Sequence, residues 1–370
     1  MIFRFSVPLF LTFICLTFVI RTAKATTEWI VNPRFENISG EETVFNRAQL
    51  QSSLSVQTST VKLYTDIFAE LDRTPKEQKQ WRRGHDQLNL QEFYLEFVGD
   101  SIFLKIGKQA TRWSESWILP SLDVWTARKY ERLFVDPVPQ QLSHSSGAVF
   151  TYVKPLWSID IAAMGDVPQD TYPEPFPKKI EIEKTDAINP GARLKFETFG
   201  LQSTLVAARA LQINTFGYAV NYAFNNWVAK AEVGQSIDDR IDSAIIQDIQ
   251  FATLGTDIFW GNLTMTPQVT AFKRHESTLE PDDQAIAFIS FQYAADAHEL
   301  QLQSFTNTTY SSDFWSAQYT YTHQQNLSLT ALAQNYNGDV GSLTGLVKDQ
   351  TGGFLFGLRI QYIADLLKGD

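Results

Sequence analysis

Alternation of apolar and polar residues is the dominant pattern in this chain, and it is clearest near the C-terminus. Between Gly353 and Ile363, one face of an extended segment would carry Phe354, Phe356, Leu358, Ile360 and Tyr362. The opposite face would carry Leu355, Gly357, Arg359 and Gln361, because strand side chains point to alternate sides at successive residues. The pattern predicts a strand with one apolar face and one mostly polar face.

The same alternation recurs along the chain. It covers residues 157–161, 192–197, 217–225, 227–233, 262–271, 315–321 and 327–334. A soluble β-sandwich also alternates, but its strands usually have about five or six residues. Several of these runs approach the roughly nine to eleven residues that a tilted strand needs to cross a bilayer. Residues 204–211 and 284–294 are apolar on both faces, so the sequence does not orient them.

A sheet that spans a membrane must close on itself. Hydrocarbon offers no hydrogen-bond partner to an exposed sheet edge, so only a closed barrel pairs every backbone group. We therefore predict an all-β fold, a closed transmembrane antiparallel β-barrel. The number of runs suggests about 16 strands, with 14 or 18 as alternatives, because single-chain bacterial barrels normally have even strand numbers. The last strand would end near Tyr362, and residues 363–370 would run past it as a tail.

Connections between the predicted strands come in two sizes. Those near Gly200, Asn225-Asn226 and Gly261-Asn262 are short, as periplasmic turns of outer-membrane barrels are. Residues 71–88, 165–190, 275–283 and 335–351 are long, polar and rich in Pro, Gly or Asp, which predicts external loops. The first of these contains the basic stretch DRTPKEQKQWRRGHD, which is either a solvated loop or a clamp for lipopolysaccharide phosphates.

The N-terminus predicts export. Arg4 precedes an apolar run that is slightly short for a membrane anchor, and Ala23-Lys24-Ala25 offers the small residues that signal peptidase accepts. We expect a signal peptide over residues 1–25 and one barrel domain over residues 26–370. Cleavage would leave 28 basic and 41 acidic residues, a net charge of -13, which argues against nucleic acid as a partner. Cys15, the only cysteine, lies in the leader, so the mature chain has no disulfide.

Residues 111–146 break the alternation. The segment mixes bulky apolar and charged side chains, and Pro120, Pro137 and Pro139 do not fit interior positions of a sheet ladder. Long ordered loops of this kind tend to be functional, and a barrel offers its lumen as the place to bury their tryptophans. We predict an inward-folded constriction loop or plug; the alternative is a broad external loop packed on a neighbour. The candidate constriction residues are Arg112, Trp113, Glu115, Asp123, Arg128 and Arg132.

The polar faces of the strands supply a second set of candidates. By alternation, the side chains predicted to face the lumen are Arg193, Lys195, Glu197, Lys230, Glu232 and Arg359. Rows of both signs focus the electrostatic potential and can steer solutes. The alternative is that these charges pair with one another and stiffen the wall.

The stretch from Gln91 to Trp125 carries a resemblance. Its part SIFLKIGKQATRWSESWILPSLDVW is similar to a strand of the DUF1302 family of bacterial outer-membrane proteins and of alginate-export-type porins. Five residues match that pattern: Gly107, Lys108, Gln109, Trp113 and Glu115. Ser114 replaces a common glycine, and Ala127-Arg128-Lys129 replaces the usual Asn-Pro-Arg. The resemblance covers about a tenth of the chain; it implies an outer-membrane barrel and leaves the solute undefined.

Motifs for cofactor or metal chemistry are not found in the sequence. It contains no Walker A motif, no GxGxxG and no HExxH, and its five histidines are scattered. We therefore expect no cofactor, no metal and no enzyme. His144-Ser145-Ser146 is similar to the His-x-Ser core of outer-membrane phospholipase A. However, Ser158 stands where that family places an orienting Asn, so a lipase is the remote alternative.

These patterns predict a porin-like channel of the bacterial outer membrane that passes or exports a small or amphipathic solute by diffusion. Trp113, Trp117 and Trp125 would offer stacking surfaces, and the arginines would attract anions. The alternative is a non-transporting structural or surface-binding barrel that the plug seals. The expected partners are outer-membrane lipid and lipopolysaccharide, the barrel-assembly machinery, a small solute and, for export, a periplasmic partner.

Overall fold

A computed structural model of the chain describes residues 25–40, 44–72, 87–115, 121–128, 142–168, 188–238, 248–275, 283–309, 311–324, 326–339, 342, 344–345, 348 and 352–368. The predicted signal peptide up to residue 24, the basic stretch after Asp72, Trp117 and Arg132 lie outside the described residues.

The described residues form 21 strands. Their bounds are β1 Thr26–Gly40, β2 Val44–Gln57, β3 Val61–Asp72, β4 Gln87–Val98, β5 Ile102–Gln109, β6 Ala127–Arg128, β7 Leu142–Ser143, β8 Ser145–Lys154, β9 Trp157–Asp166, β10 Asn189–Thr198, β11 Leu201–Ala210, β12 Ile213–Phe224, β13 Trp227–Asp238, β14 Asp248–Trp260, β15 Leu263–His275, β16 Asp283–Ala295, β17 His298–Asn307, β18 Ser312–His323, β19 Leu327–Asn337, β20 Phe354–Tyr362 and β21 Ala364–Lys368.

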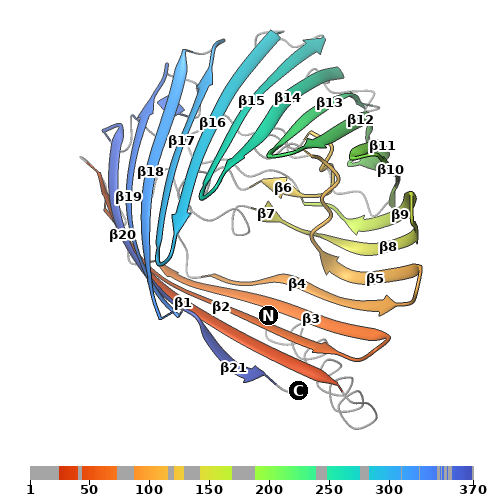
Figure 1. The fold of residues 1–370 in the computed structure, drawn as a ribbon, viewed down its shortest axis with the longest axis horizontal. Coiled ribbons are helices and arrows are strands. Elements are labelled where there is room, and N and C mark those ends of the chain that lie inside the picture. Colours follow the sequence, from red (N-terminus) through yellow and green to blue (C-terminus); the bar gives the residue numbers. More distant parts are fainter. Residues whose placement is uncertain are drawn as a thin grey trace.

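Nineteen of these strands form one antiparallel sheet that closes into a ring (Figure 1). Every strand pairs with its neighbour in the ring, and the ring closes where β1 pairs with β20 and β21, for example Ser39 with Phe356 and Glu28 with Lys368. Because β20 and β21 follow each other along β1, they occupy one position, and the barrel has 18 strand positions. The prediction of a closed antiparallel barrel is confirmed.

The expected number of about 16 strands is wrong, and 18, the larger alternative, is correct. The difference arises near the N-terminus, where alternation is weak. The outward positions of β2 mix Leu50 and Leu54 with Ser52, and the register of β3 with β4 shifts between Asp66 and Ile67. A bulge moves later side chains to the other face, so an uninterrupted period of two is not visible in the sequence.

The last strand also differs from its prediction. It does not end at Tyr362, because β21 continues the pairing with β1 as far as Lys368. Between the two pieces, the Ile363 amide donates to the Asn326 carbonyl oxygen at 2.8 Å. The residues from Ala364 to Lys368 therefore belong to the barrel wall and are not a free tail.

The two faces of the barrel wall differ in polarity as the alternation predicts. Outward side chains such as Phe216, Leu254 and Leu358 are 51%, 67% and 57% exposed, whereas inward ones such as Thr204 and Gln334 are buried. Apolar side chains that face the surroundings over a whole barrel are typical of membrane barrels. Among the described residues no helix is long and apolar enough to cross a bilayer.

Short connections gather at one end of the barrel. The turns at Gly200, Asn225-Asn226 and Gly261-Asn262 join consecutive antiparallel strands there, with backbone hydrogen bonds such as Ala223 to Gly200 at 3.0 Å. The connections predicted to be external all join strands at the opposite end. Outward tryptophans mark the first end, since Trp157 and Trp227 begin β9 and β13, and Trp260 ends β14.

Candidate functional site

The candidate site begins where β5 ends and the chain enters the ring. Gly107 has φ of 133°, and a Cβ there would collide with the backbone of Phe93, so only glycine fits this position. Two residues later, the buried Gln109 side chain donates to the carbonyl oxygens of Lys105 and Gly147, both at 3.4 Å. These two residues of the quoted motif therefore shape the exit from β5.

The chain then forms an inward segment, defined here as the described residues 111–115 and 121–128. Strand β6 of this segment pairs with β7, and Figure 1 shows both inside the ring of the barrel. The Asp123 carboxylate accepts hydrogen bonds from the amides of Trp113 and Ser114, the latter at 2.7 Å. The rings of Trp113 and Trp125 meet edge to face with centroids 4.6 Å apart. Asp123 thus organises the segment itself.

Apolar contacts hold the inward segment against the inner face of β9 to β14. Leu122 and Trp125 are 0% and 1% exposed and belong to a core cluster with wall residues such as Met164, Val206 and Ala219. A Cβ at Gly191 would collide with Trp125, and one at Gly217 with Leu122. Glycines in the wall therefore make room for two bulky side chains of the segment.

Hydrogen bonds also hold the inward segment against the barrel wall. The Trp125 indole donates to the Arg209 carbonyl oxygen at 2.8 Å. Glu232 on β13 is 2% exposed and accepts from the Ser114 hydroxyl at 2.7 and 3.0 Å and from the Glu115 amide at 3.0 Å. Buried carboxylates need such donors, and these donors come from the segment. Glu232 faces inward as predicted, and its partners make it an anchor.

Arg193 on β10 is the second polar anchor. Its Nε donates to Asp160 at 2.6 Å, and its Nη1 donates to the Arg112 carbonyl oxygen at 3.1 Å. Its guanidinium carbon lies 5.5 Å from the Trp113 ring centroid, a cation–π distance. One residue therefore links the wall, the backbone of the segment and an aromatic ring.

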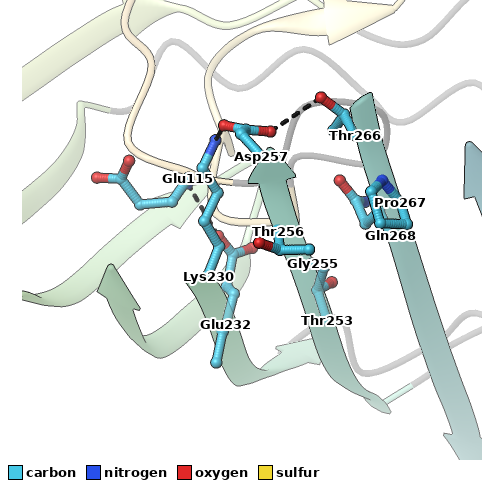
Figure 2. A pocket seen from close by; sticks show the side chains of 11 residues that line it. Glu115, Lys230, Glu232, Thr253, Gly255, Thr256, Asp257, Thr266, Pro267 and Gln268 are labelled. Atoms are coloured by element: carbon cyan, nitrogen blue, oxygen red, sulfur yellow. Dashed lines mark hydrogen bonds and ion pairs between the residues drawn. The ribbon is translucent and has the colours of Figure 1, made fainter. Parts of the chain in front are cut away.

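A small recess lies beside these anchors, between Glu115 and the inner face of β13 to β15 (Figure 2). Lys230 pairs with Asp257 at 2.6 Å, and Thr266 donates to Asp257 at 2.9 Å. Glu115 in turn lies 3.5 Å from the Lys195 amine. Arg193, Lys195 and Lys230, which were predicted to face the lumen, each have a carboxylate partner. This agrees with the alternative interpretation, in which the inward charges pair with one another and stiffen the barrel wall.

Arg359 belongs to a separate network on β20, β1, β2 and β3. Glu36, whose side chain is 1% exposed, contacts Arg34 at 3.2 Å, Arg47 at 2.5 Å and Arg359. Glu70 lies 3.7 Å from Arg47 and accepts from Gln49 at 2.5 Å. Arg34, Glu36, Arg47 and Glu70 are not among the residues predicted from the sequence, although the alternation Arg34-Phe35-Glu36 is a signal that could have placed the first two on the inner face.

The remaining predicted residues are less constrained by the structure. The Arg112 side chain is exposed, and Glu197 lies inward in register but near the end of β10, where it is also exposed. The backbone of Arg128 pairs with Leu142 in the small sheet, and its side chain, like all of Arg132, lies outside the described structure. A role of Arg112, Arg128 and Arg132 in a constriction stays a prediction.

His144 lies where the chain leaves the segment and enters β8. It is buried, and its Nδ1 lies 3.2 Å from the Gln91 carbonyl oxygen and 3.7 Å from Glu92. Burial lowers the pKa of His144 below its ordinary value near 6.5, because it penalises the charged ring; Glu92 opposes this shift. Burial therefore favours the neutral form of the ring.

The lipase alternative gains no support from this geometry. His144 faces Gln91 and Glu92, and in the described residues no hydrogen bond joins it to Ser146. Ser145, the intervening residue, donates to the Trp125 carbonyl oxygen. A serine nucleophile needs a base within hydrogen-bond reach, and neither serine is so placed. The described residues also contain no group of three or more metal-binding side chains.

Comparisons with known proteins agree on the fold. No family model and no curated protein matches the chain. Solved structures do: OccAB4 of Acinetobacter baumannii matches with a TM-score of 0.63 and 10% identity over 93% of this chain and 99% of that one. OccK3 (OpdO) of Pseudomonas aeruginosa matches with a TM-score of 0.61 and 10% identity over 93% and 96%.

A third similar structure is the outer-membrane protein OpdK of Pseudomonas aeruginosa, with a TM-score of 0.58 and 11% identity over 92% of this chain and 99% of that one. The chain has the barrel fold of these proteins. At such identities the likeness establishes the architecture alone. It supports the predicted closed β-barrel, but it does not point to the DUF1302 or alginate-export family.

Proposed function

We propose that this protein is a channel of the bacterial outer membrane through which a small solute passes by diffusion. The observation that carries the proposal is a closed barrel, apolar outside and polar inside, whose lumen contains a segment that packs, in its described residues, on the inner face of β9 to β14. A barrel of 18 strands is wide enough for an aqueous path unless something fills it. The similar structures named above share this architecture, and OpdK among them is an outer-membrane protein.

The orientation in the membrane follows from the connections. Short turns face the periplasm in bacterial barrels, and longer loops face outward, so the end with Gly200 and Gly261 would be periplasmic. The outward Trp157, Trp227 and Trp260 would then lie at the periplasmic water interface, where aromatic residues form a girdle. Lipid and lipopolysaccharide would cover the outer face, and the barrel-assembly machinery would insert the chain.

The inward segment is proposed as the constriction of this channel. It lies against β9 to β14 through Leu122, Trp125, Glu232 and Arg193, so it would narrow the path from that side. The motif at Gly107-Lys108-Gln109 supports a more specific proposal. The protein would be related to the DUF1302 and alginate-export barrels, and it would export its solute together with a periplasmic partner.

Conductance tests the proposal. The mature chain, folded in detergent and added to a planar bilayer, should give stepwise ion current. Heat-modifiable migration on gels would first show that the barrel is folded. Folded protein that gives no current would overturn the channel and favour the non-transporting barrel, in which the segment seals the lumen.

A further inference from the structure

One part of the inner wall differs in chemistry from the rest. On β16 to β19, Glu299 is the only charged side chain that faces inward among the described residues. The inward positions of these strands otherwise carry glutamine, asparagine, serine, threonine and apolar residues. This region, which we term the amide wall, lies outside the group of strands that holds the inward segment.

The centre of the amide wall is a regular array on three adjacent strands. Gln292 on β16 lies opposite Gln301 on β17, which lies opposite Gln318 on β18. The next inward row is Ser290, Gln303 and Ser316. Adjacent strands lie about 4.8 Å apart and inward residues of one strand about 6.6 Å apart, so the six side chains span roughly 10 by 7 Å.

The glutamines of this array remain accessible. Gln292 is exposed, and Gln301, Gln303 and Gln318 are partly exposed, whereas Ser290 and Ser316 are each 8% exposed. Gln292 donates to Glu299 at 2.8 Å, and Gln318 contacts Thr320 at 3.4 Å. Gln301 and Gln303 have no side-chain partner among the described residues, so their carboxamides are available.

A buried aromatic row bounds the array on the side away from the short turns. Phe305 faces Phe314 with ring centroids 5.7 Å apart, and Phe314 faces Tyr336 at 5.0 Å. Phe314 and Tyr336 are each 2% exposed. This packed row holds the strands at the edge of the array in a fixed arrangement. The accessible polar groups of the array are therefore the glutamine carboxamides.

The chemistry of the array selects an uncharged polar solute. Each carboxamide offers one acceptor oxygen and two donor hydrogens, which match hydroxyl groups, since these also donate and accept. An anion would give up water without gaining a counter-charge, and an apolar molecule would leave the carboxamides unpaired. The single inward carboxylate among the described residues of the amide wall, Glu299, already accepts a hydrogen bond from Gln292. A polyol instead replaces each lost water contact with a comparable hydrogen bond.

We propose that Gln292, Gln301, Gln303 and Gln318 form a binding track for an uncharged polyhydroxyl solute of the sugar or sugar-alcohol class. The inference rests on the proposed channel function and specifies the solute that the channel carries. The charges around Glu36 and the pairs Arg193–Asp160 and Lys230–Asp257 form ion pairs within the wall, so the accessible glutamines of the amide wall are the favoured surface for solute contact.

The test compares an uncharged hexitol with a carboxylate of similar size. Liposomes that contain the folded full-length mature barrel are transferred into mannitol or gluconate, and the rate of swelling is measured. Mannitol should also reduce the KCl current through single channels with a saturable concentration dependence. The main variant is Gln301→Leu with Gln303→Leu, and its matched control is Gln202→Leu with Asn221→Leu, an inward carboxamide pair on β11 and β12.

The main variant should slow mannitol entry by about threefold to tenfold, the effect of losing hydrogen bonds that contribute roughly 1 kcal/mol, and should weaken the block of the current. The control should retain both. A second pair, Gln301→Glu with Gln303→Glu, preserves side-chain size; it should also lose the mannitol block and should shift the reversal potential toward cation preference.

The outcomes distinguish failure of the proposed channel from failure of the proposed binding track. Absence of KCl current overturns the channel itself. KCl current with equal entry of mannitol and gluconate, or a mannitol block that survives in both glutamine variants, overturns the binding track and leaves the channel standing. If the leucine variant does not show heat-modifiable migration, the glutamate variant provides the same decision.

Discussion

Two regions of the inner wall use polar residues in opposite ways. The loop-bearing wall, β9 to β14, carries charges, and nearly every one that the structure describes has a partner: Arg193 binds Asp160, Lys230 binds Asp257, and Glu232 binds Ser114. The amide wall, β16 to β19, has a single inward charge among its described residues and a patch of accessible glutamines. Charged side chains in this barrel therefore hold the inward segment and the wall together, whereas the glutamines of the amide wall stay accessible.

The physical reason lies in the cost of burial. A segment packed on a wall excludes water, and charged groups beneath it require partners with good geometry. Glu232 meets that requirement with donors from the segment itself. Where inward side chains stay accessible, as the glutamines of the amide wall do, uncharged polar groups remain hydrated at little cost. The comparison predicts that changes to the loop-bearing wall alter the segment, and that changes to the amide wall alter solute passage.

The largest effect is expected from deletion of the inward segment. Deletion of residues 116–138 takes away Leu122 and Trp125, which pack on the loop-bearing wall. We expect single-channel conductance to rise severalfold, because the proposed constriction is gone, and to become less noisy. A deletion variant that folds, judged by heat-modifiable migration, and conducts like the parent would place the rate-limiting part of the path elsewhere.

The next largest effect is expected from Trp125→Ala. Trp125 is 1% exposed and donates to Arg209, and truncation of a buried aromatic residue costs about 3 to 5 kcal/mol. Because the barrel ladder does not involve this side chain, the loss should appear as detachment of the segment. Protease cleavage after the segment's basic residues should accelerate while heat-modifiable migration stays unchanged. Phe305→Ala on the other side of the barrel is the comparison variant, and it should not accelerate cleavage there.

Glu232→Ala should have a smaller effect of the same kind. It removes the acceptor of the hydrogen bonds from the Ser114 hydroxyl and the Glu115 amide, and hydrogen bonds to charged groups contribute about 1.5 to 3 kcal/mol each. We expect more frequent conductance fluctuations in planar bilayers. Glu232→Gln keeps one acceptor and should fall between the parent and the alanine variant; identical traces for all three would contradict the anchoring role.

The smallest effect is expected from pH. Because burial lowers the pKa of His144 in the folded state, the folded protein binds fewer protons than the unfolded chain below the ordinary value near 6.5. The stability that depends on neutral His144 is thus present above about pH 6.5 and is lost as the pH falls below it. Lowering the pH from about 7 to about 5 should increase fluctuations of the current.

The control for this prediction is His144→Gln, which cannot titrate. Glu92, Lys108 and Arg112 surround the ring electrostatically, and they remain in the variant. The fluctuations of His144→Gln should therefore depend less on pH over the same range than those of the parent. An unaltered dependence would assign the effect to another group.

The individual residues show how far sequence reasoning reached. Alternation placed Arg193, Lys195, Lys230, Glu232 and Arg359 on the inner face, where the structure has them, because the side-chain period of a strand is local and fixed. It could not show that Glu232 is covered by Ser114, because the two lie 118 residues apart in sequence. It also did not select Gly191 and Gly217, whose role depends on which bulky side chains face them.

The sequence by itself determined a closed barrel with an apolar exterior, because the alternation of each strand and the need to pair every backbone group depend only on local pattern and solvent. Only the tertiary structure decided that 18 strand positions close the ring, that the inward segment packs on β9 to β14, and that glutamines of three strands align into one array. Those features depend on registers, bulges and contacts between residues far apart in the chain, which alternation within a single strand does not encode.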